Sequence, residues 1–229
     1  MRAPLKALVL DFDGLIADTE VLWLAVLDRL YRLRGQDFPI DRQVESIGGT
    51  LHDFDPFDDL AARCGVVTAA EVEREGEALF ADWMRHEAPL PGVRRLLRDA
   101  TERGLLLGVA SSSRGSSVLP YLRQFSLAEL FDVVVTADDV TEVKPSPELY
   151  LLAARRLGVD PASVVAFEDS ARGVRAAKAA GAFCVAVPHV LTRSHDFDQA
   201  DLRLDSMALC DVDEVWEVAL GGERWSLSN

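Results

Sequence analysis

Two aspartates, Asp11 and Asp13, stand two residues apart directly after a short apolar run, in the order Asp11-Phe12-Asp13-Gly14. Alternate residues leave the end of a strand on the same side, so both carboxylates are expected to face one point. Gly14 would let a ligand approach the backbone closely. In an open parallel sheet, ligands gather beyond the carboxyl ends of the strands, where this pair would lie. By itself, the pattern would also fit an acidic surface turn.

Three other predicted strand ends carry groups of the kinds that phosphoryl transfer needs. Ser111 and Ser112, in a run of three serines, offer hydroxyl and backbone N–H groups to phosphate oxygens. Lys144 precedes a predicted helix start and can hold an ammonium against a phosphoryl group. Glu168 and Asp169 follow a buried strand and supply the oxygen ligands that a hard divalent cation requires.

Each of these signals also has an ordinary structural alternative. The serines, like Asp169 or Ser170, could be helix caps, and a single lysine is usually a solvated surface residue. The order of acid pair, hydroxyl, lysine and acid pair at successive strand ends is nevertheless hard to obtain by chance. The combination therefore favours a phosphoryl-transfer site.

The elements that must position these groups are short, apolar runs rich in β-branched residues, which predict buried strands. Between them, helical patterns end in glycines that are typical of left-handed C-caps, Gly104, Gly158 and Gly181, and Ser146-Pro147 marks another helix start. This alternation predicts right-handed crossovers and an α/β fold with a doubly wound, Rossmann-like parallel sheet. The predicted strands span residues 7–10, 105–110, 133–135, 164–167 and 183–187.

Residues 19–88 interrupt this alternation, because they contain long helical patterns and no convincing strand. A helix is predicted from Val21 to Arg34, with Leu24, Leu27 and Tyr31 at helical spacing. Thr68 and Glu71 form a possible capping box for another helix that runs to about His86. The sequence therefore predicts an inserted helical domain, with Pro89-Leu90-Pro91-Gly92 as the return linker.

The composition limits the range of partners. The chain has 229 residues, 49% of them hydrophobic, and 38 acidic against 24 basic side chains give a net charge of -14. This charge disfavours nucleic acid and membrane partners, and no Lys/Arg-rich run opposes it. An enzyme with this charge that acts on phosphate esters must neutralise its site locally, with a metal ion or with placed cations.

The cysteines and the first residues indicate a cytoplasmic protein. Cys64, Cys184 and Cys210 are far apart and lack metal-ligand spacing, so neither a disulfide framework nor a zinc site is expected. The first apolar run is short and leads directly into Asp11, which fits a strand and neither a signal peptide nor a membrane span.

The motifs resemble those of a known family. Asp11 to Glu20, Ser111, Lys144 to Pro147 and Glu168-Asp169-Ser170 resemble the four motifs of the haloacid dehalogenase-like hydrolases. The sequence is most similar to the branch of phosphosugar phosphatases and β-phosphoglucomutases, which carry a helical cap inserted after the first motif. The resemblance covers nearly the whole chain and implies a catalytic core of residues 1–18 and 89–229 and a helical cap of residues 19–88.

The resemblance also implies an activity, that of a magnesium-dependent phosphatase of small phosphorylated metabolites, chiefly sugar phosphates. Asp11 would be the nucleophile that forms an aspartyl phosphate, and Asp13 would be the general acid and base. Mg²⁺ would be bound by Asp11, the Asp13 main-chain carbonyl and Asp169, with Glu168 more remote from the ion. The phosphoryl group would be held by Gly14, Ser111, Ser112 and Lys144.

Three alternatives remain at this point. A phosphosugar mutase shares these motifs, but the resembling mutases have a histidine where this chain has Trp23, which could also be a core or hinge aromatic. A signalling receiver module is about half as long and lacks the helical insertion. A binding protein without activity would be expected to have lost one of Asp11, Asp13, Lys144 and Asp169, and all four are present.

Residues that select the substrate are harder to predict. Arg42, His52, Arg63 and Arg114 could contact a sugar or a second phosphate. The acidic segment from His52 to Asp55 resembles a metal site only superficially, and a helix N-cap around Asp55-Pro56 fits it better.

Overall fold

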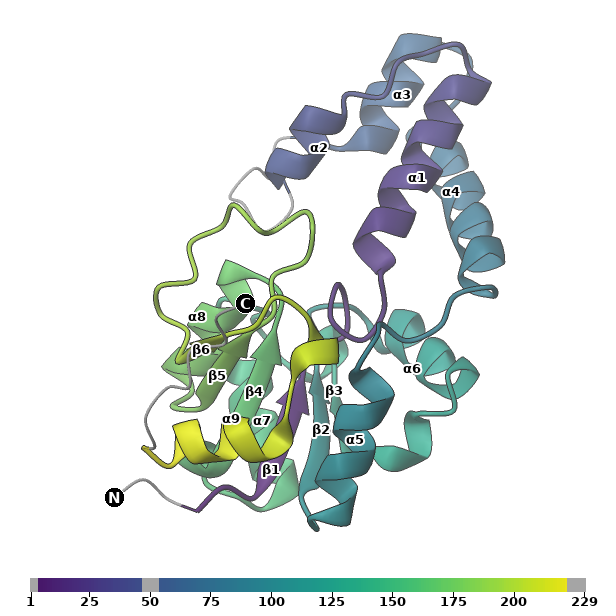
Figure 1. Ribbon diagram of the computed structural model, residues 1–229. Coiled ribbons are helices and arrows are strands. Elements are labelled where there is room, and N and C mark those ends of the chain that lie inside the picture. Colours follow the sequence, from purple (N-terminus) through teal and green to yellow (C-terminus); the bar gives the residue numbers. More distant parts are fainter. Residues whose placement is uncertain (1–3, 47–53, 222–229) are drawn as a thin grey trace. The chain divides into compact units, whose positions relative to one another are not determined.

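A parallel sheet organises the larger of two units in the computed structural model, which describes residues 4–46 and 54–221 (Figure 1). Its strand order is β3-β2-β1-β4-β5-β6, and every neighbouring pair is parallel. The predicted doubly wound α/β fold is therefore confirmed. The strands are β1 (Ala7–Leu10), β2 (Leu106–Ala110), β3 (Val133–Val135), β4 (Val164–Glu168), β5 (Phe183–Ala186) and β6 (Leu202–Arg203).

The central strands are hydrophobic on both faces because helices cover both sides of the sheet. All residues of β1, β4 and β5 are buried, as expected for a parallel sheet between two helical layers. In Figure 1, α5 and α9 lie over one face, and α7 and α8 over the other. The helices are α5 (Val93–Glu102), α6 (Gly115–Gln124), α7 (Glu148–Leu157), α8 (Ala171–Ala179) and α9 (Val212–Ala219).

Short 3₁₀ turns complete the unit at η1 (Ala128–Leu130), η2 (Ala137–Asp139), η3 (Pro161–Ser163) and η4 (Met207–Leu209). The predicted helix-ending glycines, Gly104, Gly158 and Gly181, have φ angles of 71°, 70° and 91° and are confirmed. One predicted helix start was displaced: Pro147 holds the N-cap position of α7, and Ser146 precedes it. The Ser146 hydroxyl still accepts from Glu148 N, two residues on, at 3.4 Å, as a capping side chain does.

The second unit comprises residues 18–88, and its described part contains helices joined by loops and no strand. Its helices are α1 (Thr19–Leu33), α2 (Ile40–Ser46), α3 (Pro56–Cys64) and α4 (Ala69–Met84), and α4 packs against both α1 and α3. Leu24, Leu27 and Tyr31 are buried, in agreement with their helical spacing. The capping box is confirmed: Thr68 N donates to Glu71 Oε2 at 2.8 Å, and Glu71 N donates to the Thr68 hydroxyl at 3.3 Å.

Two further sequence predictions fall in this helical unit. The Asp55 side chain accepts from Phe57 N and Asp58 N, so the predicted N-cap of α3 is confirmed. His52 and Asp53 lie outside the described residues. Among the helices that the structure describes, none has both the length and the apolar character needed to cross a membrane.

Candidate active site

The predicted site residues meet at the carboxyl edge of the sheet, because the strands that precede them are parallel neighbours. β1 lies between β2 and β4, with Leu10 in register with Val109 and Phe167. The ladder continues one residue further, where Asp11 N donates to the Phe167 carbonyl at 3.0 Å. Chain segments far apart in the sequence thus deliver their polar residues to one edge.

Asp11 occupies the centre of this edge and is only 6% exposed. The Phe12 side chain, between the two aspartates, is fully buried, while Phe12 N donates to Asp11 Oδ1 at 2.7 Å. Lys144 Nζ lies 2.8 Å from the same oxygen. Burial raises the pKa of Asp11 well above its ordinary range, and the neighbouring ammonium opposes this shift.

Lys144 lies between two carboxylates. Its Nζ is 2.8 Å from Asp11 Oδ1 and 2.7 Å from Glu168 Oε1, and the side chain is 4% exposed. Burial alone would lower the pKa of this ammonium, but Asp11 and Glu168 together raise it above its ordinary value. The Lys144 carbonyl accepts from Arg172 at 2.6 Å, which fixes the backbone of the loop. The alternative of a solvated surface lysine was therefore wrong.

Glu168 is fully buried and is held from two sides. Its Oε1 accepts from the Tyr150 hydroxyl at 2.5 Å and also lies next to Lys144. Its Oε2 lies against Gly173, where an added Cβ would be only 1.7 Å away. Tyr150 could not be predicted as a site residue, because a tyrosine at a helical spacing that fits the core resembles an ordinary packing residue.

Asp169 is buried and its backbone is fixed by a distant loop. The Thr192 hydroxyl donates to the Asp169 carbonyl at 2.6 Å and is itself buried. Gly14 has a φ of +71°, and a Cβ there would lie 2.3 Å from Asp169 Oδ2. Glycine is therefore required at position 14 both for its backbone conformation and for the space that Asp169 fills. The alternative that this motif caps a helix holds for Ser170, whose hydroxyl caps α8.

Asp13 has different surroundings from Asp11. Its Oδ2 accepts from the Ser113 hydroxyl at 2.7 Å and from the Ser111 hydroxyl at 3.2 Å. Ser111 Oγ in turn accepts from Ser113 N at 3.0 Å. Ser112 is exposed. Sequence reasoning named Ser111 and Ser112 but missed Ser113, and the alternative of a serine N-cap was wrong, since Arg114 occupies the N-cap position of α6.

The acidic groups could hold a divalent cation. Asp11, Glu168 and Asp169 are all buried, and one carboxylate oxygen of each lies within 4.8 Å of the others. Carboxylate oxygens are preferred ligands of Mg²⁺ and Ca²⁺. Lys144 compensates part of this buried negative charge, and a bound cation would compensate more. The residues therefore fit a metal ion of this kind.

The side chains proposed for substrate selection have local contacts. Arg42 lies over the Phe54 ring, 4.3 Å from its centroid, and Arg63 pairs with Asp59 at 2.7 Å. Arg114 is exposed at the start of α6. A contact of Arg42, Arg63 or Arg114 with a sugar or a second phosphate therefore stays a prediction.

Trp23 packs inside the helical unit. Its ring stacks on Phe80, with centroids 4.5 Å apart, and meets Phe57 edge-on at 6.2 Å. The α4 backbone also approaches it, because a Cβ at Gly76 would lie 3.5 Å from the Trp23 ring. These contacts agree with the interpretation of Trp23 as a packing aromatic.

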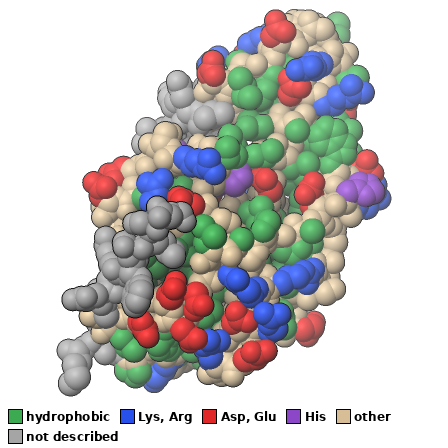
Figure 2. Space-filling view, viewed as in Figure 1, with side chains coloured by type: hydrophobic (Ala, Val, Ile, Leu, Met, Phe, Trp, Pro, Cys, Tyr) green, Lys and Arg blue, Asp and Glu red, His purple; other side chains and the backbone are tan. Residues whose placement is uncertain are grey.

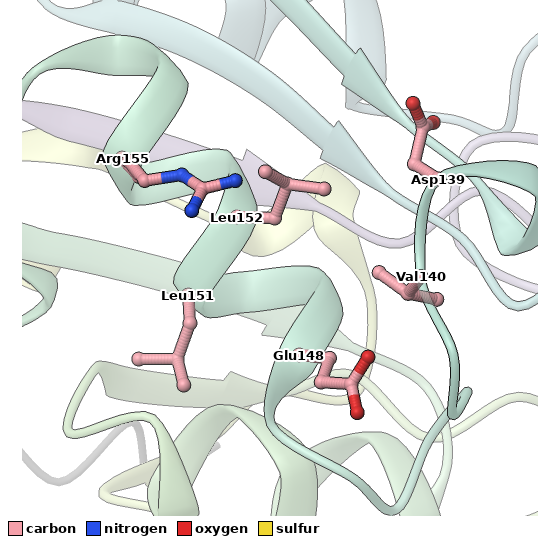
Figure 3. Close-up of a pocket in the computed structure, with 6 residues that line it drawn as sticks. All are labelled: Asp139, Val140, Glu148, Leu151, Leu152 and Arg155. Atoms are coloured by element: carbon pink, nitrogen blue, oxygen red, sulfur yellow. The ribbon is translucent and has the colours of Figure 1, made fainter.

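A separate surface pocket of about 290 Å³ lies beside α7 and contains none of the predicted site residues (Figure 3). Its Glu148 carboxylate accepts from Thr141 N at 2.9 Å, a bond that shapes the preceding loop. The lining residues are Asp139, Val140, Glu148, Leu151, Leu152 and Arg155. We assign this pocket no part in the chemistry.

Comparison with known proteins gives matches along most of the chain. Residues 8–187 match the model of a family described as haloacid dehalogenase-like hydrolase. The YhcW protein of Bacillus subtilis is 45% identical over 205 residues, which cover 89% of this chain and 93% of that protein. The phosphorylated carbohydrates phosphatase of Thermotoga maritima is 31% identical over 219 residues, covering 93% and 98% of the two chains.

The same relationship holds for solved structures. The crystal structure of CbbY from Rhodobacter sphaeroides in complex with phosphate has a TM-score of 0.70 and 31% sequence identity. The match covers 90% of this chain and 96% of that one. Sequence and fold therefore relate this chain to the same group of proteins.

Proposed function

The chain belongs to the haloacid dehalogenase-like hydrolases, and we propose that it is a magnesium-dependent phosphatase of small phosphorylated sugars. The observation that carries the proposal is the convergence of Asp11, Lys144 and Asp169 at one buried point, beside Asp13 and its serine partners. The names of its relatives add to this, since one acts on phosphorylated carbohydrates.

In this proposal, Asp11 attacks the phosphorus atom and the bond from phosphorus to the sugar oxygen breaks. Asp13 gives its proton to that leaving oxygen, and the phosphoryl group remains on Asp11 as an aspartyl phosphate. Asp13 then takes a proton from water, whose oxygen attacks the phosphorus and displaces Asp11. The products are the free sugar and inorganic phosphate, and both aspartates return to their first state.

The other site residues bind and orient the reacting groups. Lys144, already fixed beside Asp11, donates to the phosphoryl oxygens and offsets their charge. Ser111, Ser112 and Gly14 complete the proposed phosphoryl site. Asp11, the Asp13 main-chain carbonyl and Asp169 would hold Mg²⁺, and Glu168 would lie behind them, since its Oε1 is engaged by Lys144 and Tyr150. When bound, the ion neutralises phosphoryl charge and orients the Asp11 carboxylate.

A panel of phosphate monoesters, assayed with Mg²⁺ and with a chelator, tests the proposal. Hexose and pentose phosphates should release inorganic phosphate with Mg²⁺, and the chelator should stop this release. Absence of hydrolysis of every ester in the presence of Mg²⁺ would refute the proposed function.

Trp23 further supports hydrolysis over the mutase reaction, in which the phosphoryl group is transferred back to the sugar. A mutase must delay the attack of water until the sugar reorients, and the resembling mutases use a histidine at this position. The indole of Trp23 only donates and does not titrate near neutral pH, and it is packed against Phe57 and Phe80. We therefore favour the phosphatase.

We also propose that the helical segment 19–88 acts as a cap that limits substrate size. If so, small phosphate esters should be cleaved far better than phosphoproteins, and efficient turnover of a phosphoprotein would exclude this role.

The face in Figure 2 shows Lys and Arg side chains interspersed with Asp and Glu. Together with the net charge of -14, this surface favours a small anionic substrate bound at a neutralised site over a polyanion.

A further inference from the structure

Tyr150 brings a buried hydroxyl to the acidic site from the first turn of α7. Its side chain is 2% exposed, and its hydroxyl lies 2.5 Å from Glu168 Oε1. We propose that Tyr150 is a positioning residue, whose hydroxyl holds Glu168 so that Lys144 remains available to the transferring phosphoryl group. The inference rests on the proposed function, because it concerns the phosphoryl site of that reaction.

The contacts of Glu168 show why the hydroxyl matters. Both Tyr150 and Lys144 approach Oε1, at 2.5 Å and 2.7 Å. Among the described residues, Oε2 has no hydrogen-bond partner, and it packs against Gly173. The carboxylate is therefore held through one oxygen, by two donors whose bonds are strengthened by its charge.

Glu168 and the phosphoryl group of the substrate compete for the Lys144 ammonium. The ammonium lies 2.8 Å from Asp11 and 2.7 Å from Glu168, so any donor that satisfies Glu168 weakens its hold on the lysine. A phenol donates at neutral pH, because its ordinary pKa is near 10. Without this donor, the buried charge of Glu168 would act on Lys144 alone and draw it away from a phosphoryl oxygen.

Tyr150→Phe isolates this effect. The variant keeps the ring, which lies 5.5 Å from Lys144 Nζ, and removes only the hydroxyl. We expect kcat/KM on a sugar phosphate to fall about tenfold, equivalent to about 1.4 kcal/mol of transition-state stabilisation. Binding of inorganic phosphate, measured calorimetrically with Mg²⁺ and without turnover, should weaken by about threefold or more because Lys144 contacts the phosphate.

Tyr31→Phe is the matched control. The Tyr31 hydroxyl also bonds a carboxylate, Asp59 Oδ2, at 2.8 Å, but it does so in the helical unit. Both variants lose one hydrogen bond to a charged acceptor and should lose similar stability, measured by urea unfolding. Tyr31→Phe should keep kcat/KM within about twofold of wild type, because its bond does not reach Lys144.

A double-mutant cycle with Glu168→Gln tests whether Tyr150 acts through Glu168. In the Glu168→Gln background, adding Tyr150→Phe should change phosphate binding by less than about twofold. An equally large effect in both backgrounds, or wild-type kcat/KM and phosphate binding in folded Tyr150→Phe, would overturn the inference. A wild-type protein that neither binds phosphate nor cleaves any ester would instead refute the proposed function.

Discussion

Replacing Gly173 by alanine should separate the catalytic role of Glu168 from the stability of the fold. Gly173 lies in the first turn of α8, and a Cβ there would be 1.7 Å from Glu168 Oε2 and 2.0 Å from Glu168 Cδ. Contacts of real Cβ atoms do not fall below 3.0 Å, so Glu168 or the helix must move by about 1 Å or more. Glu168 cannot move without disturbing its contacts with Lys144 and Tyr150.

The expected effects on stability and on activity differ in size. Overpacking costs about 1–3 kcal/mol, while alanine in place of a helical glycine returns about 1 kcal/mol. The free energy of unfolding should therefore fall by about 2 kcal/mol, and by more to the extent that the buried contacts of Glu168 are lost. A displacement of about 1 Å in a catalytic site can lower the rate about 100-fold. We therefore expect kcat/KM to fall by roughly that factor in a protein that is still folded.

Urea unfolding and steady-state phosphate release measure the two quantities on the same sample. Gly115→Ala is the control, because a Cβ at this helix start would meet no atom nearer than 3.4 Å. That variant should keep its activity within about threefold of wild type. Folded Gly173→Ala with kcat/KM as high as the control would refute the reasoning, since it would show that the position of Glu168 does not affect catalysis.

Other predictions address the nucleophile, the metal, the products and the helical unit. Asp11→Asn should abolish turnover with an unchanged circular dichroism spectrum, because the amide is nearly isosteric but cannot attack phosphorus; turnover in the folded variant would contradict the mechanism. Asp169→Ala should raise the Mg²⁺ concentration for half-maximal activity about tenfold or more, and an unchanged midpoint would exclude Asp169 as a ligand. With β-glucose 1-phosphate, each turnover should release inorganic phosphate; accumulation of glucose 6-phosphate without free phosphate would indicate a mutase. Thr68→Ala should lower stability by about 1 kcal/mol in urea unfolding, through loss of the α4 cap. The hydrogen bond that the Thr68 backbone N–H donates to Glu71 lowers the pKa of the Glu71 carboxyl group. The contribution of Glu71 to the free energy of unfolding should therefore be complete above the ordinary glutamate pKa and be lost as the pH falls through the lowered value. A free energy of unfolding that does not change over this pH range would contradict this prediction.

The strands of the sheet could be predicted from sequence wherever burial on both faces left a continuous apolar run. Residues 7–10, all of them buried, were found this way with the bounds that the structure has. β6 was missed because its two residues, Leu202 and Arg203, are not buried and form no such run. It is a strand because β5 offers a free edge, which is a tertiary condition and not a local one.

The site could be predicted where chemistry and chain position coincide. Asp11 directly follows a strand, and Lys144 precedes a helix. Polar residues at the ends of predicted elements can be recognised from the sequence. Three hydroxyl groups that contact the site could not be recognised in this way, because they reach their partners only in the folded chain. They are those of Tyr150, which bonds Glu168, Ser113, which bonds Asp13, and Thr192, which bonds the Asp169 carbonyl. Supporting contacts of this kind depend on distances between elements, which spacing along the chain does not encode.

The central place of β1 has a consequence for how the chain folds as it is synthesised. Ala7 pairs with Leu106 on one side and with Val164 on the other, so β1 has no strand partner until β2 has left the ribosome, and one of its edges stays unpaired until β4 follows. Residues 18–88 differ, because their helices pack against one another within that segment and can associate much earlier. Until β4 emerges, the apolar strand before Asp11 is exposed to chaperones and to neighbouring nascent chains. Asp11 and Asp13, which follow β1, are thus synthesised well before Lys144 and Asp169, the residues beside which Asp11 comes to lie.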